Sequence, residues 1–159
     1  HSKHSDGEYV GLVYDESESE FVLFKTGSKP STTLDRAAGT YETADLQVGG
    51  LHLEDKLVLD STELTISTGS ITVSKSRHTV DTEGDASTDD LTSIGGGVDG
   101  QMLVLTSADS ARDIVVKSSG NIATPGLTDF TLGDVNDSLM LMYMASQSKW
   151  ITISSSNNA

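Results

Sequence analysis

Residues 57–80 read LVLDSTELTISTGSITVSKSRHTV, a stretch in which large aliphatic residues alternate with serine, threonine and charged residues. The aliphatic positions are Leu57, Leu59, Leu64, Ile66, Ile71 and Val73. A period of two is the pattern of a β-strand with one buried face, and an isolated two-stranded ribbon is only marginally stable in water. We therefore expect residues 51–79 to form an intertwined β stem in which three copies bury these six side chains along a common axis. The alternative is a plain meander inside one monomeric sandwich.

The flanking segments also favour strands, and no convincing helical stripe interrupts them. Residues 9–14 (YVGLVY) lead through the acidic stretch 15–20 to residues 21–25 (FVLFK), which predicts a β-hairpin. We place this N-terminal β unit at residues 1–50, ending near Gly49 and Gly50. Further strands are expected at 101–106, 113–117, 129–132, 138–144 and 150–154. Their spacing is typical of an antiparallel β-sandwich or barrel, which we assign to residues 80–159. The predicted fold class is all-β.

Composition excludes several classes of protein. The 159 residues carry 24 Asp+Glu against 10 Lys+Arg, a formal charge of −14, whereas a nucleic-acid binder needs clustered basic residues. The absence of cysteine excludes disulfides, thiolate nucleophiles and cysteine-based zinc sites. No apolar run approaches the length of a membrane span and the first residues are polar, so neither a membrane span nor a signal peptide is visible in this sequence.

The apolar content is low for a chain of this length. Leu, Ile, Val and Phe together make up 38 of 159 residues, close to the composition at which chains fail to build a core. A chain with so little apolar surface commonly completes its burial against a partner subunit. We therefore expect an obligate oligomer, and specifically a homotrimer.

Two loops contain residues that bind ligands in other proteins. Residues 95–100 (GGGVDG) superficially match a phosphate-binding loop, but a strand rather than a helix is expected after them, so the glycines more simply serve a tight turn. Asp81, Glu83 and Asp85 alternate along one loop and could surround calcium. Their spacing does not fit an EF-hand, so we expect a solvated acidic loop and no cofactor, with calcium at these three residues as the alternative.

Catalytic constellations are weak in this sequence. Ser76, His78 and Asp81 follow one another locally, whereas the members of a catalytic triad normally come from separate elements and act beside an oxyanion hole. Carboxylate pairs for glycoside cleavage are available by residue type, but sugar subsites usually offer aromatic platforms and this chain has few aromatic residues. We expect a protein without enzymatic activity; a polysaccharide depolymerase is the enzymatic alternative.

Trp150 and Tyr143 are the aromatic residues for which we weigh a binding role. Trp150 lies in the strand pattern of residues 149–153, on the face opposite Ile151. It fits a position in the core or in a subunit interface, and alternatively an outward position where it stacks on a host glycan. Tyr143 is the second candidate for contact with a receptor or a neighbouring subunit.

The order of these segments resembles modules of bacteriophage virion proteins. The C-terminal half is similar to a β-domain that recurs in tail-fibre and other structural proteins of tailed bacteriophages, and the N-terminal part is similar to a module of marine phage structural proteins. The segments that carry the first resemblance are 89–97, 100–105, 111–117, 120–122, 129–132, 139–143 and 149–150, and those that carry the second are 11–17, 21–24 and 44–49.

This resemblance implies a trimeric, non-enzymatic structural component on the exterior of the virion, in a tail fibre, head fibre or other appendage. It carries over no catalytic residue and implies other virion proteins as partners. A capsid decoration protein is the first alternative, because only residues 51–80 are long enough to serve as a fibre shaft. A module that binds a host surface glycan is the second. An acidic surface suits the particle exterior better than a lining that faces DNA.

Overall fold

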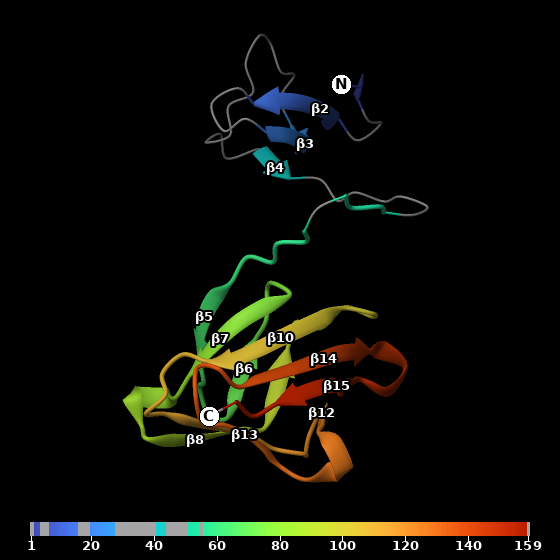
Figure 1. Ribbon diagram of the computed structural model, residues 1–159. Helices are drawn as coiled ribbons and strands as arrows, with labels where there is room; N and C mark the ends of the chain where they lie inside the picture. Colours follow the sequence, from blue (N-terminus) through green and yellow to red (C-terminus); the bar gives the residue numbers. More distant parts are fainter. Residues whose placement is uncertain are drawn as a thin grey trace. The chain divides into compact units, whose positions relative to one another are not determined.

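The computed structural model describes residues 2–3, 7–15, 20–27, 41–43, 51–54 and 56–158. Within them every regular element is a β-strand or a short 3-10 turn, so the predicted all-β fold is confirmed (Figure 1). The chain divides into two units, residues 1–55 and residues 56–159. No helix in this described part of the chain has the length and apolar character that a membrane crossing requires.

The N-terminal unit contains a four-stranded antiparallel sheet in the order β1-β2-β3-β4. Its strands are β1 (Ser2–Lys3), β2 (Tyr9–Asp15), β3 (Glu20–Thr26) and β4 (Tyr41–Thr43). β2 and β3 pair along their full length, from Tyr9 opposite Thr26 to Asp15 opposite Glu20. The hairpin predicted from the acidic turn and its apolar flanks is therefore confirmed. The predicted end of this unit at Gly49 and Gly50 lies outside the described residues.

The second unit contains eleven strands in three sheets, with short 3-10 turns at Glu83–Asp85, Pro125–Leu127 and Ala145–Gln147. The largest sheet has the order β12-β15-β14-β10-β7-β5, a second has the order β13-β11-β8, and β6 pairs with β9. The strands are β5 (Thr62–Thr65), β6 (Ser70–Thr72), β7 (Arg77–Asp81), β8 (Thr88–Leu91), β9 (Ser93–Gly95), β10 (Met102–Ser107), β11 (Asp113–Val116), β12 (Ile122–Ala123), β13 (Phe130–Leu132), β14 (Ser138–Met144) and β15 (Lys149–Ser156).

The first half of this unit follows a coiled path. β6, β7 and β8 lie in three different sheets, and each pairs in parallel with the strand three places later, β9, β10 and β11. The pairs include Ser70 with Ser93, Arg77 with Val104, and Thr88 with Asp113, so the separation along the chain is nearly the same each time. The chain thus makes two successive turns of about the same length and stacks the second on the first, as in a solenoid.

This coil differs from the predicted antiparallel sandwich or barrel. Of the eight strand pairings among the described residues of the second unit, five are parallel and three are antiparallel. Parallel neighbours need a long crossover, and here the crossover passes through strands of the other sheets instead of through a helix. Strand spacing along the sequence gives no information on this order, because it is the same for a meander and for a coil.

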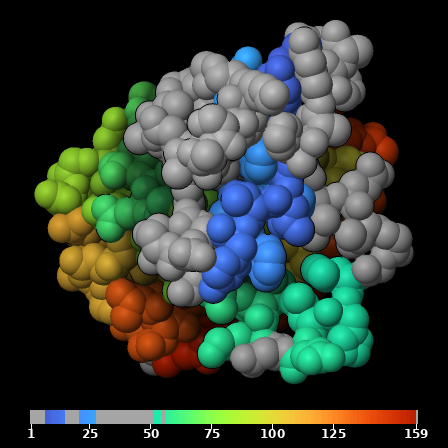
Figure 2. All heavy atoms as spheres, turned by 90° about the horizontal axis from the view of Figure 1, so that it is seen from above, coloured from blue at the N-terminus to red at the C-terminus, as the bar shows by residue number. Residues whose placement is uncertain are grey.

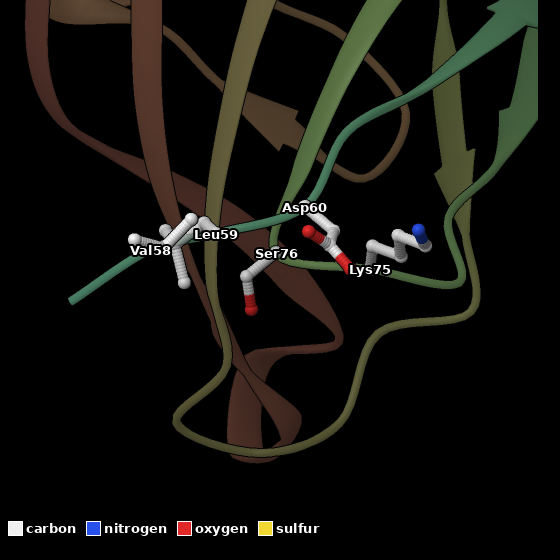
Figure 3. Close-up of a pocket in the computed structure, with 5 residues that line it drawn as sticks. All are labelled: Val58, Leu59, Asp60, Lys75 and Ser76. Atoms are coloured by element: carbon white, nitrogen blue, oxygen red, sulfur yellow. The ribbon is translucent and has the colours of Figure 1, made fainter. Parts of the chain in front are cut away.

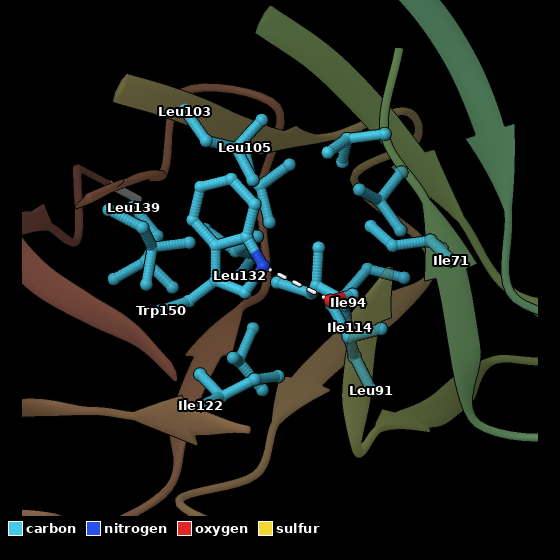
Figure 4. Packing of buried hydrophobic residues seen from close by; sticks show 14 of the residues in the cluster. Ile71, Leu91, Ile94, Leu103, Leu105, Ile114, Ile122, Leu132, Leu139 and Trp150 are labelled. Atoms are coloured by element: carbon cyan, nitrogen blue, oxygen red, sulfur yellow. Dashed lines mark hydrogen bonds between the residues drawn. The ribbon is translucent and has the colours of Figure 1, made fainter. Parts of the chain in front are cut away.

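One contiguous core fills the second unit, and in it residues from all three sheets meet around Trp150 (Figure 4). Leu64, Phe130 and Tyr143 pack against this core from partly buried positions. The buried members are Ile66, Ile71, Val73, Val80, Leu91, Ile94, Leu103, Leu105, Ile114, Val116, Ile122, Leu132, Leu139, Leu141 and Trp150. A single chain therefore encloses a complete core, contrary to the expectation from its low apolar content.

The predicted stem is the main correction. Ile66, Ile71 and Val73 are 1%, 4% and 4% exposed in a single chain, so their burial does not require sister chains. The physical reason is that this stretch pairs with later strands of its own unit. The Ile66 N–H donates to the Asp81 carbonyl at the end of β7, and β6, which contains Ile71, pairs with β9. The border drawn between residues 79 and 80 is therefore wrong, and residues 56–80 belong to the second unit. Only Leu57 and Leu59 lie ahead of β5, the first exposed and the second half-buried.

Candidate interaction surfaces

Trp150 is a structural residue at the centre of the second unit. Its side chain is fully buried, its indole N–H donates a hydrogen bond of 3.1 Å to the Ile94 carbonyl, and its ring lies 5.1 Å from that of Tyr143. Gly97 covers this aromatic pair so closely that a Cβ there would lie 2.6 Å from the Tyr143 ring. The interpretation of Trp150 as a core residue is confirmed, and its alternative role in glycan stacking is wrong because the ring has no surface to offer. The same contact shows that Gly97, one of the glycines of residues 95–100, serves close packing.

Asn121 is an organising residue that sequence reasoning missed. Its side-chain carbonyl accepts a hydrogen bond of 3.0 Å from the Ile94 N–H, and its NH₂ group donates one of 2.7 Å to the Ile94 carbonyl. This amide therefore occupies the edge of β9 as the backbone of a further strand would. Ile71, Ile94 and Asn121 follow one another at nearly equal spacing along the chain, so Asn121 ends the stack where a third turn of the coil would continue.

The carboxylates of the acidic loop bind protein groups. Asp81 Oδ2 lies 2.6 Å and Asp85 Oδ1 lies 2.9 Å from Nη1 of Arg112, and Glu83 Oε2 accepts a hydrogen bond of 3.1 Å from the Thr68 N–H. In the described part of the chain, no three acidic or histidine side chains converge as a metal site would require. The loop is held to the domain by Arg112, a contact that the sequence analysis did not identify.

Arg112 also sets the protonation behaviour of Asp81. The hydrogen bond from the guanidinium lowers the pKa of Asp81 below its ordinary value of 3.8, against the opposing effect of desolvation. A carboxyl group whose pKa is lower in the folded state stabilises the fold above its unfolded pKa and loses this contribution as the pH falls through the folded value.

The Arg112→Gln variant is therefore expected to melt a few degrees below wild type at pH 7, with a difference that shrinks as the solution is acidified below about pH 4. Thermal unfolding followed by circular dichroism at a series of pH values measures this. Arg77→Gln is the matched control, because Arg77 is exposed and its replacement removes the same charge. An equal effect of both variants at every pH would contradict the assigned ion pair.

His78 does not form a triad with Ser76 and Asp81. Its Nε2 accepts hydrogen bonds from the N–H groups of Ser74, at 3.3 Å, and Lys75, at 3.1 Å. Since Nε2 is the acceptor, Nδ1 carries the proton and donates to the Thr62 carbonyl at 2.9 Å. The imidazole is fully buried and both nitrogens are bound to backbone groups. This histidine joins β5 to the turn before β7.

The N-terminal unit exposes an apolar surface, which we call the hairpin face. It consists of Leu12 opposite Leu23 and Tyr14 opposite Phe21, two cross-strand pairs on the same side of β2 and β3. Leu12, Tyr14 and Phe21 are 60%, 49% and 72% exposed, and the two rings lie 5.0 Å apart. The other side of β3 buries Val22, Phe24 and Thr26. In Figure 2 blue atoms of this unit lie at the surface in view.

A second exposed apolar segment precedes β5. We call residues 51–54 and 56–61 the connector; none of them belongs to a strand. Leu51, Leu53, Leu57 and Val58 are all exposed, and the last two are each 67% exposed. Val58, Leu59 and Asp60 line an open, shallow pocket together with two residues of the turn before β7 (Figure 3). This part of the predicted stem is the part that a single chain leaves uncovered.

Comparison with protein families and curated proteins finds no match for this chain.

Proposed function

We propose that the chain is a non-enzymatic structural module on the exterior of a bacteriophage virion and that it assembles as a homotrimer. Its all-β architecture, its net charge of −14 and the resemblance of its segments to phage fibre modules support this proposal. In this proposal the second unit serves as a self-contained head, and the residues ahead of β5 hold the three copies together.

The distribution of exposed apolar side chains carries the proposal. Among residues whose exposure the structure describes, seven of the thirteen large exposed apolar side chains lie ahead of β5. The remaining six are spread over the chain from β5 onward, which makes up most of the described residues. Contiguous exposed apolar patches mark interaction sites, and burying them is the main favourable term in association. The N-terminal unit and the connector are therefore where copies of the chain meet.

The Phe21→Asp variant tests this assignment. Burial of one phenylalanine side chain contributes about 2 kcal/mol, and a trimer loses that contribution three times. We expect the variant to sediment as a single chain of 16.8 kDa at micromolar concentration, where wild type sediments as a trimer. Val98→Asp is the control, because Val98 is 69% exposed and belongs to the second unit. A trimer that survives Phe21→Asp and dissociates with Val98→Asp would assign the interface elsewhere.

The location on the particle is tested by labelling. Gold-labelled antibody against the second unit is expected to decorate intact virions in electron micrographs, on a fibre or appendage. Label spread over the capsid surface would assign the role of a decoration protein. Intact virions without label, in a preparation whose lysate contains the protein, would contradict a virion component.

A further inference from the structure

The edge of the six-stranded sheet at β15 is an unfilled strand position. β12 pairs with β15 only at Ile122 and Ala123, opposite Trp150 and Ile151. Beyond Ile151, β15 continues to Ser156 and, among the described residues, no strand pairs with this outer edge. A groove runs along it, lined by Ala123, Thr124, Pro125, Leu127, Ile151, Thr152, Ile153, Ser154 and Ser155. We call this the β15 groove.

Three features of the β15 groove carry a free-energy cost in the single chain. The Thr152 hydroxyl is buried and has no hydrogen-bond partner. Leu127 is held in the left-handed region at φ 58° and presents a side chain that is 76% exposed. Ile153 lies at an irregularity in the pairing of β14 with β15 and is 55% exposed. Buried unpaired hydroxyls and strained non-glycine residues both carry a free-energy cost and tend to mark binding sites.

The chemistry of the groove specifies its occupant. None of its nine lining residues is charged, although the chain carries a net charge of −14. None is aromatic, so the groove offers no platform for a sugar ring. An open strand edge beside apolar side chains suits an extended, uncharged peptide segment, which adds backbone hydrogen bonds and inserts alternate side chains.

The chain itself contains a segment of this chemistry. Leu57-Val58-Leu59 is an uncharged run in the connector; it lies outside the strands, and Leu57 and Val58 are exposed. The connector leads into β5, which is the edge of the large sheet opposite β12 and β15. A contact between the connector of one copy and the β15 groove of the next joins two different surfaces. Such head-to-tail contacts close into rings, so this contact is compatible with three-fold symmetry.

The geometry points to strand exchange within the trimer: residues 57–59 of one copy occupy the β15 groove of the neighbouring copy. This inference rests on the proposed homotrimer and names the contact that closes it. In the filled groove Leu57 or Val58 packs against the exposed side chains of Leu127 and Ile153. The hairpin face then provides a second contact near the N-terminus.

Cysteine cross-linking tests the exchange directly, because the natural chain contains no cysteine. The full-length double variant Leu57→Cys/Ile153→Cys is expected to form a covalent trimer under mild oxidation, seen on a non-reducing denaturing gel. An equimolar mixture of the two single variants is expected to form covalent dimers, and each single variant alone is not. Leu57→Cys/Val98→Cys is the control, since Val98 is also exposed, at 69%, but lies outside the groove.

The native mass of the same samples separates the two proposals. A trimeric double variant that forms covalent trimers more than tenfold faster than the Val98 control supports the exchange. A trimeric double variant that cross-links no faster than this control overturns the exchange and leaves the homotrimer standing. A monomeric wild-type protein overturns both.

Discussion

Replacing Trp150 by alanine is expected to lower the stability of the second unit by about 4 kcal/mol, the range observed when large aromatic residues are truncated in a core. The indole is fully buried, contacts Tyr143 and donates to the Ile94 carbonyl, so the variant loses packing and a hydrogen bond together. Since the free energy of unfolding of typical domains is only about 5–15 kcal/mol, the variant is expected to lose a large part of its stability. Urea unfolding followed by far-ultraviolet circular dichroism measures the loss.

Two controls separate packing from a surface role. Lys149→Ala changes the exposed neighbour on the same strand and is expected to leave the urea midpoint near that of wild type. Trp150→Phe keeps an apolar ring and loses the N–H donor. Its urea midpoint is therefore expected to lie between those of Trp150→Ala and Lys149→Ala. Trp150 is the single tryptophan of the chain, and its emission in the native wild type is expected to be that of a dry environment. Wild-type stability of Trp150→Ala would contradict the core described above.

The Asn121→Asp variant is expected to lose about 3 kcal/mol at pH 7, because the carboxylate that replaces the NH₂ donor faces the Ile94 carbonyl. The loss depends on pH in a defined direction. A protonated aspartic acid at this position again donates to that carbonyl, so the pKa of the new side chain is raised in the folded state. A group with a raised folded pKa binds more protons when folded, so the penalty is smallest at low pH and grows as the pH rises through the folded pKa.

The measurement is urea unfolding of variant and wild type side by side from pH 4 to pH 8. Comparison at each pH removes the effect of the other carboxylates. Asn157→Asp is the matched control, because Asn157 is exposed and the same charge is added there. A loss of stability that is equal for both variants, or constant over the pH range, would contradict the position of Asn121 at the edge of β9.

The sequence predicts the parts of this fold that depend on residues close together in the chain. The hairpin of β2 and β3 follows from two apolar segments and the acidic turn between them, and most strands of the second unit lie where alternation places them. The parallel coil escapes prediction because its partners, such as Ser70 and Ser93, are separated by two other strands, and the strands themselves are short. Alternation shows which side of a strand is buried, but it does not show which strand lies beside it.

The same distinction explains the error over the stem. Alternation correctly predicts that Ile66 and Ile71 face inward, but their partners lie in β7 and β9 of the same chain instead of in sister chains. The low average content of apolar residues does not show where they lie, and fifteen of the twenty buried residues of this unit are apolar. The roles of Asn121 and Arg112 arise from contacts with Ile94 and Asp81, which are distant in the chain, and a single sequence gives no signal for such contacts.

The native mass of the full-length chain tests the central claim most directly. Sedimentation equilibrium over a hundredfold range of concentration is expected to give three times the 16.8 kDa of one chain, with dissociation only at the dilute end. A constant mass of 16.8 kDa at every concentration would show that the hairpin face and the connector do not hold copies together, and the proposed assembly would then be wrong.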